Sequence, residues 1–175
     1  LLRLIAGLET PTAGSIQIDG QAAAPDPAAL GFAMVFQRDA LLPHLTAREN
    51  VELGLRLRGI PRAEIEQRTA DAETILHLGG AWDRLPRALS GGERQRAALA
   101  RGWVLRPRAL LLDEPLSALD PSLRAELRAE LKLLQRRLGA TVVHVTHDQH
   151  EAMALGDRVA VVHAGVMRQV DTPDG

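Results

Sequence analysis

The 175-residue sequence contains no cysteine and no tyrosine, and it has only two tryptophans and two phenylalanines. The lack of cysteine excludes disulfide frameworks, thiol catalysis and cysteine-based zinc sites. The scarcity of aromatic side chains argues against surfaces that stack nucleic-acid bases, and a formal net charge of -1 gives no electrostatic reason to expect nucleic acid as a partner. The apolar runs are far shorter than a membrane-spanning helix, and no signal peptide opens the chain. We therefore expect a cytoplasmic protein.

The rest of the composition is typical of a soluble globular protein, with 46% hydrophobic and 25% charged residues. The length suffices for one good core, or for a core with a small subdomain. The first residues, 1–8, have the pattern of a helix already under way, and the end at 171–175 is abrupt. We expect a fragment that is cut at both ends.

The sequence ALLLDE at 109–114 places two carboxylates directly after a buried strand. The apolar run from Ala109 to Leu112 is typical of a strand inside a parallel sheet, and Asp113 and Glu114 follow at its carboxyl end. Ligands bind at that end of open α/β sheets. Adjacent acids repel each other unless a cation or a proton lies between them, so this position indicates a site. A strand followed by an ordinary polar loop is the alternative.

Other apolar segments also predict strands, and several of them end on polar side chains. The segment 31–36 ends on Gln37, and the segment 141–145 ends on Thr146 and His147. Further strands are expected at 15–19, at 159–163 and at 166–170, where the last two pair across Ala164 and Gly165, and 21–30 is expected to be a loop. Alternation with helices predicts an α/β fold with a mostly parallel sheet, so the polar residues at the strand ends share one edge.

Helices are expected between these strands. The residues 45–88 predict a helical insertion, in which Thr46 and Glu49 form a capping box before a helix to about Arg58. Pro61 suits the first turn of a second helix that runs to His77 or Leu78. We expect an α/β core at 1–44 and 89–175, interrupted by this insertion. A later helix carries a leucine stripe at 123, 127, 131, 134 and 138, which is too short for a coiled coil and is expected to pack on the sheet.

Two segments have both a structural and a functional interpretation. Ser90 and Glu93 form a capping-box pattern, which leaves the two glycines between them unexplained, because glycine is costly in a helix. Gly91 and Gly92 would let a phosphate approach bare N–H groups at the positive end of the helix. Asp120 is a good helix N-cap before a proline, or else a ligand-binding residue.

Three histidines, His144, His147 and His150, invite comparison with a metal site. They are expected within a strand, at its end and on the following helix, so they do not share a face, and no cysteine supports them. We do not expect a metal site there.

The residues at the shared edge have the chemistry that phosphoryl transfer requires. That reaction needs a carboxylate that holds a metal, a group that orients the attacking water, and donors to the γ-phosphate. Asp113 fits the Mg²⁺ position and Glu114 fits the base that polarises water. The amide of Gln37 can contact both water and metal, and His147 can donate to the γ-phosphate.

Taken together, these segments resemble the ATP-binding subunit of ABC transporters over nearly the whole chain. LSGGERQR at 89–96 resembles the signature motif, LLLDEP at 110–115 the Walker B motif with its catalytic glutamate, SALD at 117–120 the D-loop, Gln37 the Q-loop, and His147 the switch histidine. They occur in the family order with similar spacing. The segments 1–14 and 145–153 are similar to importer subunits. The resemblance implies a P-loop NTPase-like, RecA-like core.

The resemblance also implies partners and cofactors. ATP and Mg²⁺ would bind between two subunits in a head-to-tail dimer, with Ser90, Gly91, Gly92, Glu93 and Asp120 acting in trans. Residues 37–60 would receive a transmembrane permease subunit, and a substrate-binding protein would be an indirect partner. Such a subunit is cytoplasmic and peripheral on the inner face of the membrane, where it powers solute import. The transported substrate belongs to the other subunits.

The family's phosphate-binding Walker A loop, G-x-x-x-x-G-K-[ST], and the aromatic residue that stacks on adenine are missing. The single lysine, Lys132, lies on the leucine-striped helix, and Leu1 would directly follow the loop. We infer truncation, and we expect residues 1–175 to bind ATP poorly and to hydrolyse it negligibly. The alternatives are a non-transport ABC ATPase, disfavoured by the short insertion, and a catalytically dead relative, disfavoured by Glu114 and His147.

Overall fold

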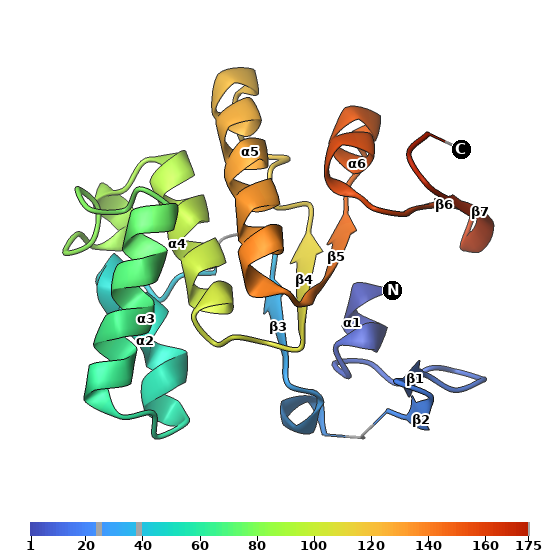
Figure 1. Ribbon diagram of the computed structural model, residues 1–175, viewed down its shortest axis with the longest axis horizontal. Coiled ribbons are helices and arrows are strands. Elements are labelled where there is room, and N and C mark those ends of the chain that lie inside the picture. Colours follow the sequence, from blue (N-terminus) through green and yellow to red (C-terminus); the bar gives the residue numbers. More distant parts are fainter. Residues whose placement is uncertain (24–25, 38–39, 175) are drawn as a thin grey trace.

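A three-stranded parallel sheet organises the computed structural model, which describes residues 1–23, 26–37 and 40–174. The central strand β4 (Ala109–Asp113) pairs with β3 (Phe32–Val35) on one side and with β5 (Thr141–Val145) on the other (Figure 1). The register aligns Val35 with Leu112 and Asp113 with Val145. All three strands therefore end at the same edge, as the sequence predicts for an α/β fold.

Helices pack on the sheet through apolar side chains at helical spacing. In α5 (Pro121–Leu138), Leu127, Leu131 and Leu134 are at most 1% exposed and Leu123 is partly buried against the same cluster, which confirms that this part of the leucine stripe packs into the core. The side chain of Leu138 lies outside the described residues. A helix before β4, α4 (Gly91–Trp103), approaches the sheet at Gly102, where an added Cβ would lie 3.1 Å from Leu110 and 3.2 Å from a Val35 methyl. The short helix α1 (Leu2–Ile5) packs against Ala109 and Leu111 in a second, smaller cluster.

The residues 45–88, predicted to be a helical insertion, contain α2 (Ala47–Leu57), α3 (Arg62–Ile75) and a short 3₁₀-helix, η2 (Pro86–Ala88). The predicted capping box is present, because Thr46 Oγ1 accepts from the Glu49 N–H at 3.2 Å and Glu49 Oε2 accepts from the Thr46 N–H at 2.8 Å. The helix α3 ends before His77, where φ is +50°, so the prediction of an end at His77 or Leu78 was wrong by a few residues.

The N-terminal part has more regular structure than the sequence predicts. Instead of a strand over 15–19 and a loop over 21–30, two-residue strands β1 (Gln17–Ile18) and β2 (Gln21–Ala22) form an antiparallel hairpin. Asp19 and Gly20 make the turn with φ of +53° and +76°. A 3₁₀-helix, η1 (Pro27–Leu30), follows, and Asp26 caps it by accepting from the Ala28 N–H.

The C-terminal part contains α6 (Gln149–Leu155) and an antiparallel hairpin of β6 (Val159–His163) and β7 (Val166–Asp171). This confirms the pairing across Ala164 and Gly165. However, β6 pairs with β7 and, within the described residues, not with the β3–β4–β5 sheet, so the alternation did not extend that sheet to a fourth parallel strand (Figure 1). Pairing with β7 satisfies the backbone hydrogen bonds of β6 along one edge only. Val161 and Val162 are about half exposed, at 49% and 51%.

Across the described ranges, no helix combines the length and the apolar character that crossing a membrane requires.

Candidate active site

Three side chains predicted from separate parts of the sequence meet at the carboxyl edge of the sheet. Gln37, two residues after β3, donates a hydrogen bond from Nε2 to Oε2 of Glu114 at 3.0 Å. His147, two residues after β5, places Nδ1 3.2 Å from the same oxygen. Glu114 follows β4 directly. The parallel register therefore brings an amide and an imidazole from the two outer strands onto one carboxylate oxygen.

The backbone of Glu114 is left-handed, with φ of +44°. An L-residue pays about 1–2 kcal/mol for this conformation, and such strain clusters at functional sites. The Glu114 N–H donates to the Val145 carbonyl at 2.9 Å, and the Glu114 carbonyl accepts from the backbone and the hydroxyl of Ser117 at 3.2 and 3.0 Å. These bonds hold a sharp turn that ends the strand pairing and directs the carboxylate to the edge.

Asp113 is the last residue of β4 and is partly buried. In the described part of the chain, its carboxylate has neither a hydrogen-bond nor an ion-pair partner. An unpaired carboxylate at the end of β4 fits Mg²⁺, which takes one or two protein oxygens and completes its shell with water and substrate phosphates. The described residues contain no cluster of three or more His, Cys, Asp or Glu that could hold a metal alone, and a Mg²⁺ site of this kind does not need one.

The helix α4 begins with the capping box that the sequence predicts at Ser90 and Glu93. Ser90 Oγ accepts from the Glu93 N–H at 3.2 Å, and Glu93 Oε2 accepts from the Ser90 N–H at 2.8 Å. The hydrogen bond from the Ser90 backbone, together with Arg84, lowers the pKa of Glu93 against a smaller effect of burial. Ser90 and Gly91 are exposed. Within the described residues, no hydrogen bond or ion pair links this segment to Gln37, Glu114 or His147.

The structure gives Gly92 a packing role that the sequence did not reveal. An added Cβ would lie 2.5 Å from Cδ2 of Leu123 at the start of α5, whereas at Gly91 the nearest atom is 3.9 Å away, on Arg94. A side chain at position 92 would therefore have to displace the end of the Leu123 side chain, so glycine suits the close contact between α4 and α5. Access of a ligand to bare N–H groups stays a prediction for both glycines, and packing against Leu123 is an additional reason for glycine at position 92.

These two glycines form a matched pair for mutation. We expect Gly91→Ala to stabilise the protein by about 0.5–1 kcal/mol, because alanine loses less backbone entropy in a helix, and Gly92→Ala to destabilise it by about 1–3 kcal/mol through overpacking. Urea unfolding monitored by circular dichroism measures both. Equal effects of the two substitutions would contradict the packing role of Gly92.

Asp120 caps α5. Its Oδ1 accepts hydrogen bonds from the N–H groups of Ser122 and Leu123, both at 3.1 Å, so Asp120 is the helix N-cap that the sequence offered as one interpretation. The residue is also exposed. A role across a dimer interface stays a prediction. Lys132, the single lysine, donates to the Leu155 carbonyl at 3.0 Å and joins α5 to α6.

Sequence reasoning missed a buried network beside His147. Glu151, on α6, is 3% exposed and accepts from the Thr146 hydroxyl at 2.7 Å, while its Oε1 lies 3.0 Å from Nε2 of His144. Burial raises the pKa of Glu151, but the hydrogen bonds from His144 and Thr146 outweigh that effect and lower it. The network joins α6 to the end of β5 and so fixes the segment that carries His147. A lone glutamate on a short helix gives no sequence signal of this role.

A pH dependence of stability follows from the lowered pKa of Glu151. Its contribution is fully present above the ordinary value of 4.5 and is lost as the pH falls through the lowered value. We expect the free energy of unfolding of the natural chain to exceed that of Glu151→Gln near neutral pH, and the difference to shrink as the solution is acidified. Urea unfolding of both proteins over a pH series tests this, and a difference that grows on acidification would contradict it.

A second missed residue is Arg124. Its Nη2 donates to the Leu119 carbonyl at 2.9 Å, and its Nη1 lies 3.8 Å from Oδ2 of Asp148, the neighbour of His147. One side chain therefore links the segment 117–120 to the His147 segment.

Comparison with known proteins gives one consistent family. A family model described as "ABC transporter" matches residues 1–117. The sn-glycerol-3-phosphate import ATP-binding protein UgpC 3 of Rhizobium johnstonii is 53% identical over 174 residues, which are 99% of this chain and 50% of that protein. The trehalose/maltose import ATP-binding protein MalK of Thermococcus litoralis is 51% identical over 180 residues, covering 99% and 48%. The chain spans about half the length of the curated relatives it matches.

Two solved structures are similar throughout. The dimeric post-hydrolysis state of the ATP-binding cassette MJ0796, bound to ADP and Pi, has a TM-score of 0.83 at 32% identity and covers 99% of this chain and 79% of that chain. The cbiO1 protein of Clostridium perfringens, part of the ABC transporter complex cbiONQ, has a TM-score of 0.88 at 26% identity, with coverage of 98% and 71%. The α/β architecture is thus that of the ABC ATPase domains that the chain matches.

Proposed function

The chain belongs to the ABC transporter family, and we propose that it forms part of an ATP-hydrolysing subunit that powers solute import. The observation that carries the proposal is the shared oxygen of Glu114, which receives the Gln37 amide and lies beside the His147 imidazole. The printed names of the relatives support the importer class, and no observation favours the non-transport or catalytically dead alternatives.

In this proposal Glu114 accepts the proton of the attacking water. Gln37 and His147 hold the carboxylate in place before water binds, and they orient the water and the γ-phosphate when ATP is bound. Asp113 and the Gln37 amide oxygen would hold Mg²⁺, which neutralises the charge of the phosphates when it is bound. The strained turn at Glu114 fixes the base against the end of β5.

We propose further that two subunits act together. Ser90, Gly91, Gly92, Glu93 and Asp120 would face the nucleotide of a partner subunit, which the exposure of Ser90, Gly91 and Asp120 and the dimeric state of the MJ0796 structure support. The division into a core at 1–44 and 89–175 and a helical subdomain at 45–88 is part of this proposal.

A transmembrane permease subunit would contact residues 37–60, of which 38 and 39 lie outside the described residues. The subunit would lie on the cytoplasmic face of the membrane, with a substrate-binding protein as an indirect partner. The names of the relatives support a sugar or a polyol phosphate as the imported solute.

The test is an ATPase assay on two polypeptides. We expect residues 1–175 alone to hydrolyse ATP negligibly, because the single lysine, Lys132, donates its hydrogen bond to the Leu155 carbonyl and does not reach the phosphates. We expect Mg²⁺-dependent hydrolysis once a loop of the pattern G-x-x-x-x-G-K-[ST] precedes Leu1. An inactive extended polypeptide that binds ATP, or activity in residues 1–175 that disappears on Glu114→Gln, would overturn this account.

A further inference from the structure

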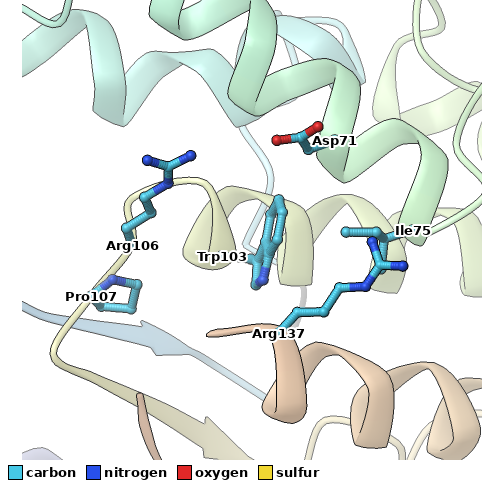
Figure 2. A pocket seen from close by; sticks show the side chains of 6 residues that line it. All are labelled: Asp71, Ile75, Trp103, Arg106, Pro107 and Arg137. Atoms are coloured by element: carbon cyan, nitrogen blue, oxygen red, sulfur yellow. The ribbon is translucent and has the colours of Figure 1, made fainter. Parts of the chain in front are cut away.

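We propose that a pocket at the amino end of β4 binds a small organic monoanion with a flat apolar part, of the aromatic carboxylate type. The pocket has a volume of about 450 Å³ and lies between α3, the end of α4 and the last turns of α5, with these lining residues: Asp71, Ile75, Trp103, Arg106, Pro107 and Arg137 (Figure 2). Pro107 precedes β4, whereas Glu114 follows it, so the pocket and the candidate active site lie at opposite ends of the strand. The inference does not depend on nucleotide binding.

The apolar part of the ligand would contact Trp103, Ile75 and Pro107. Figure 2 shows the indole of Trp103 standing between the two arginines, with Ile75 to one side of it. The Nε1 atom of Trp103 is covered from solvent and has no hydrogen-bond partner among the described residues. Because Nε1 is covered, a ligand in the pocket would contact the indole through its apolar ring atoms.

The charged part of the ligand would be held by two guanidinium groups. Arg106 and Arg137 are exposed, and within the described residues neither side chain has a hydrogen bond or an ion pair. A free guanidinium binds a carboxylate through two parallel hydrogen bonds and also stacks on flat rings. The Arg106 backbone is left-handed, with φ of +47°, and its N–H donates to the Trp103 carbonyl at 3.0 Å, which fixes where this side chain leaves the loop.

The opposite charge at the pocket limits which anions fit. Asp71 lines the pocket from α3 and is also exposed and unpaired within the described residues (Figure 2). Two arginines against one aspartate leave a single positive charge. A monoanion neutralises that charge, whereas a compact polyanion such as phosphate meets repulsion from Asp71 and leaves Trp103 uncovered.

The test uses the fluorescence of Trp103 in the natural chain and in Trp82→Phe, where Trp103 is the one remaining tryptophan. We expect benzoate to change the emission saturably, and benzamide, which has the same shape without the charge, to bind at least tenfold more weakly. Inorganic phosphate is expected to bind at least tenfold more weakly as well. Calorimetric titration of the natural chain with benzoate gives the same affinity without any substitution.

Alanine variants test whether benzoate binding depends on the arginines that line the pocket. Arg106→Ala and Arg137→Ala are each expected to weaken benzoate binding at least tenfold, and Arg136→Ala, an exposed neighbour on α5 that does not line the pocket, to leave it unchanged. Equal binding of benzamide or of phosphate, equal effects of Arg136→Ala and Arg137→Ala, or absence of any saturable binding would overturn the proposal.

Discussion

Glu114→Gln is expected to lower the rate of ATP hydrolysis about 10²–10⁴-fold in the polypeptide extended by a phosphate-binding loop. The substitution preserves the volume of the side chain and an oxygen that can accept the Gln37 hydrogen bond, and it removes the group that takes the proton from water. Phosphate release in a single turnover at saturating ATP measures the step directly. ATP affinity is expected to change little, because Glu114 is assigned to the water and not to the phosphates.

A matched control is Glu66→Gln on α3, which makes the same chemical change in an exposed ion pair with Arg62. Its ATPase rate is expected to equal that of the unmodified protein. If Glu114→Gln retains more than about a tenth of that rate, Glu114 is not the general base, since proton transfer by a positioned side chain contributes about 10²–10⁴-fold.

Leu112→Ala is expected to lower the free energy of unfolding by about 2–5 kcal/mol. Leu112 is 0% exposed in the central strand and belongs to the main hydrophobic cluster. Truncation leaves a cavity directly before Asp113, at the base of the candidate site. Guanidinium unfolding with intrinsic fluorescence measures the loss, and the fluorescence of buried Trp82, which belongs to the same cluster, reports it.

Leu133→Ala provides the control for that loss. Leu133 lies on α5 with 52% of its surface exposed, so its truncation removes little buried area and is expected to change stability by less than about 0.5 kcal/mol. Comparable losses for the two substitutions would mean that β4 is not the centre of the core.

The sequence predicted the parts of the fold that depend on buried apolar runs. Continuous apolar segments favoured buried strands in a parallel sheet, and parallel pairing places the polar residues that follow them at one edge. Burial itself was correct only for β4, because β3 alternates between buried and partly buried residues and β5 has no fully buried residue. The meeting of Gln37, Glu114 and His147 on one oxygen is the consequence, and it needed only the order of these segments. The two capping boxes, at Thr46 and Ser90, were equally local and equally predictable.

The features that sequence reasoning missed depend on spatial neighbours far apart in the chain. The placement of β6 outside the parallel sheet depends on which strand offers it a free edge. The residue pattern of a strand predicts the strand itself but does not predict which other strand it pairs with. The left-handed backbone of Glu114 occurs where its N–H bonds the Val145 carbonyl of a distant strand, and the lowered pKa of Glu151 arises from His144 and Thr146 at the end of β5. For Gly92, the residue that explains the glycine lies on a different helix.

The two glycines at the ends of α4 have a consequence for evolution. Gly92 leaves room for Leu123 and Gly102 leaves room for Val35 and Leu110, about 15 Å apart along one helix axis. A larger residue at either position is tolerated only when its neighbour becomes smaller. In an alignment of relatives, position 92 is therefore expected to covary with 123, and position 102 with 35 and 110. Such paired substitutions would identify the residues that contact α4 from sequences alone.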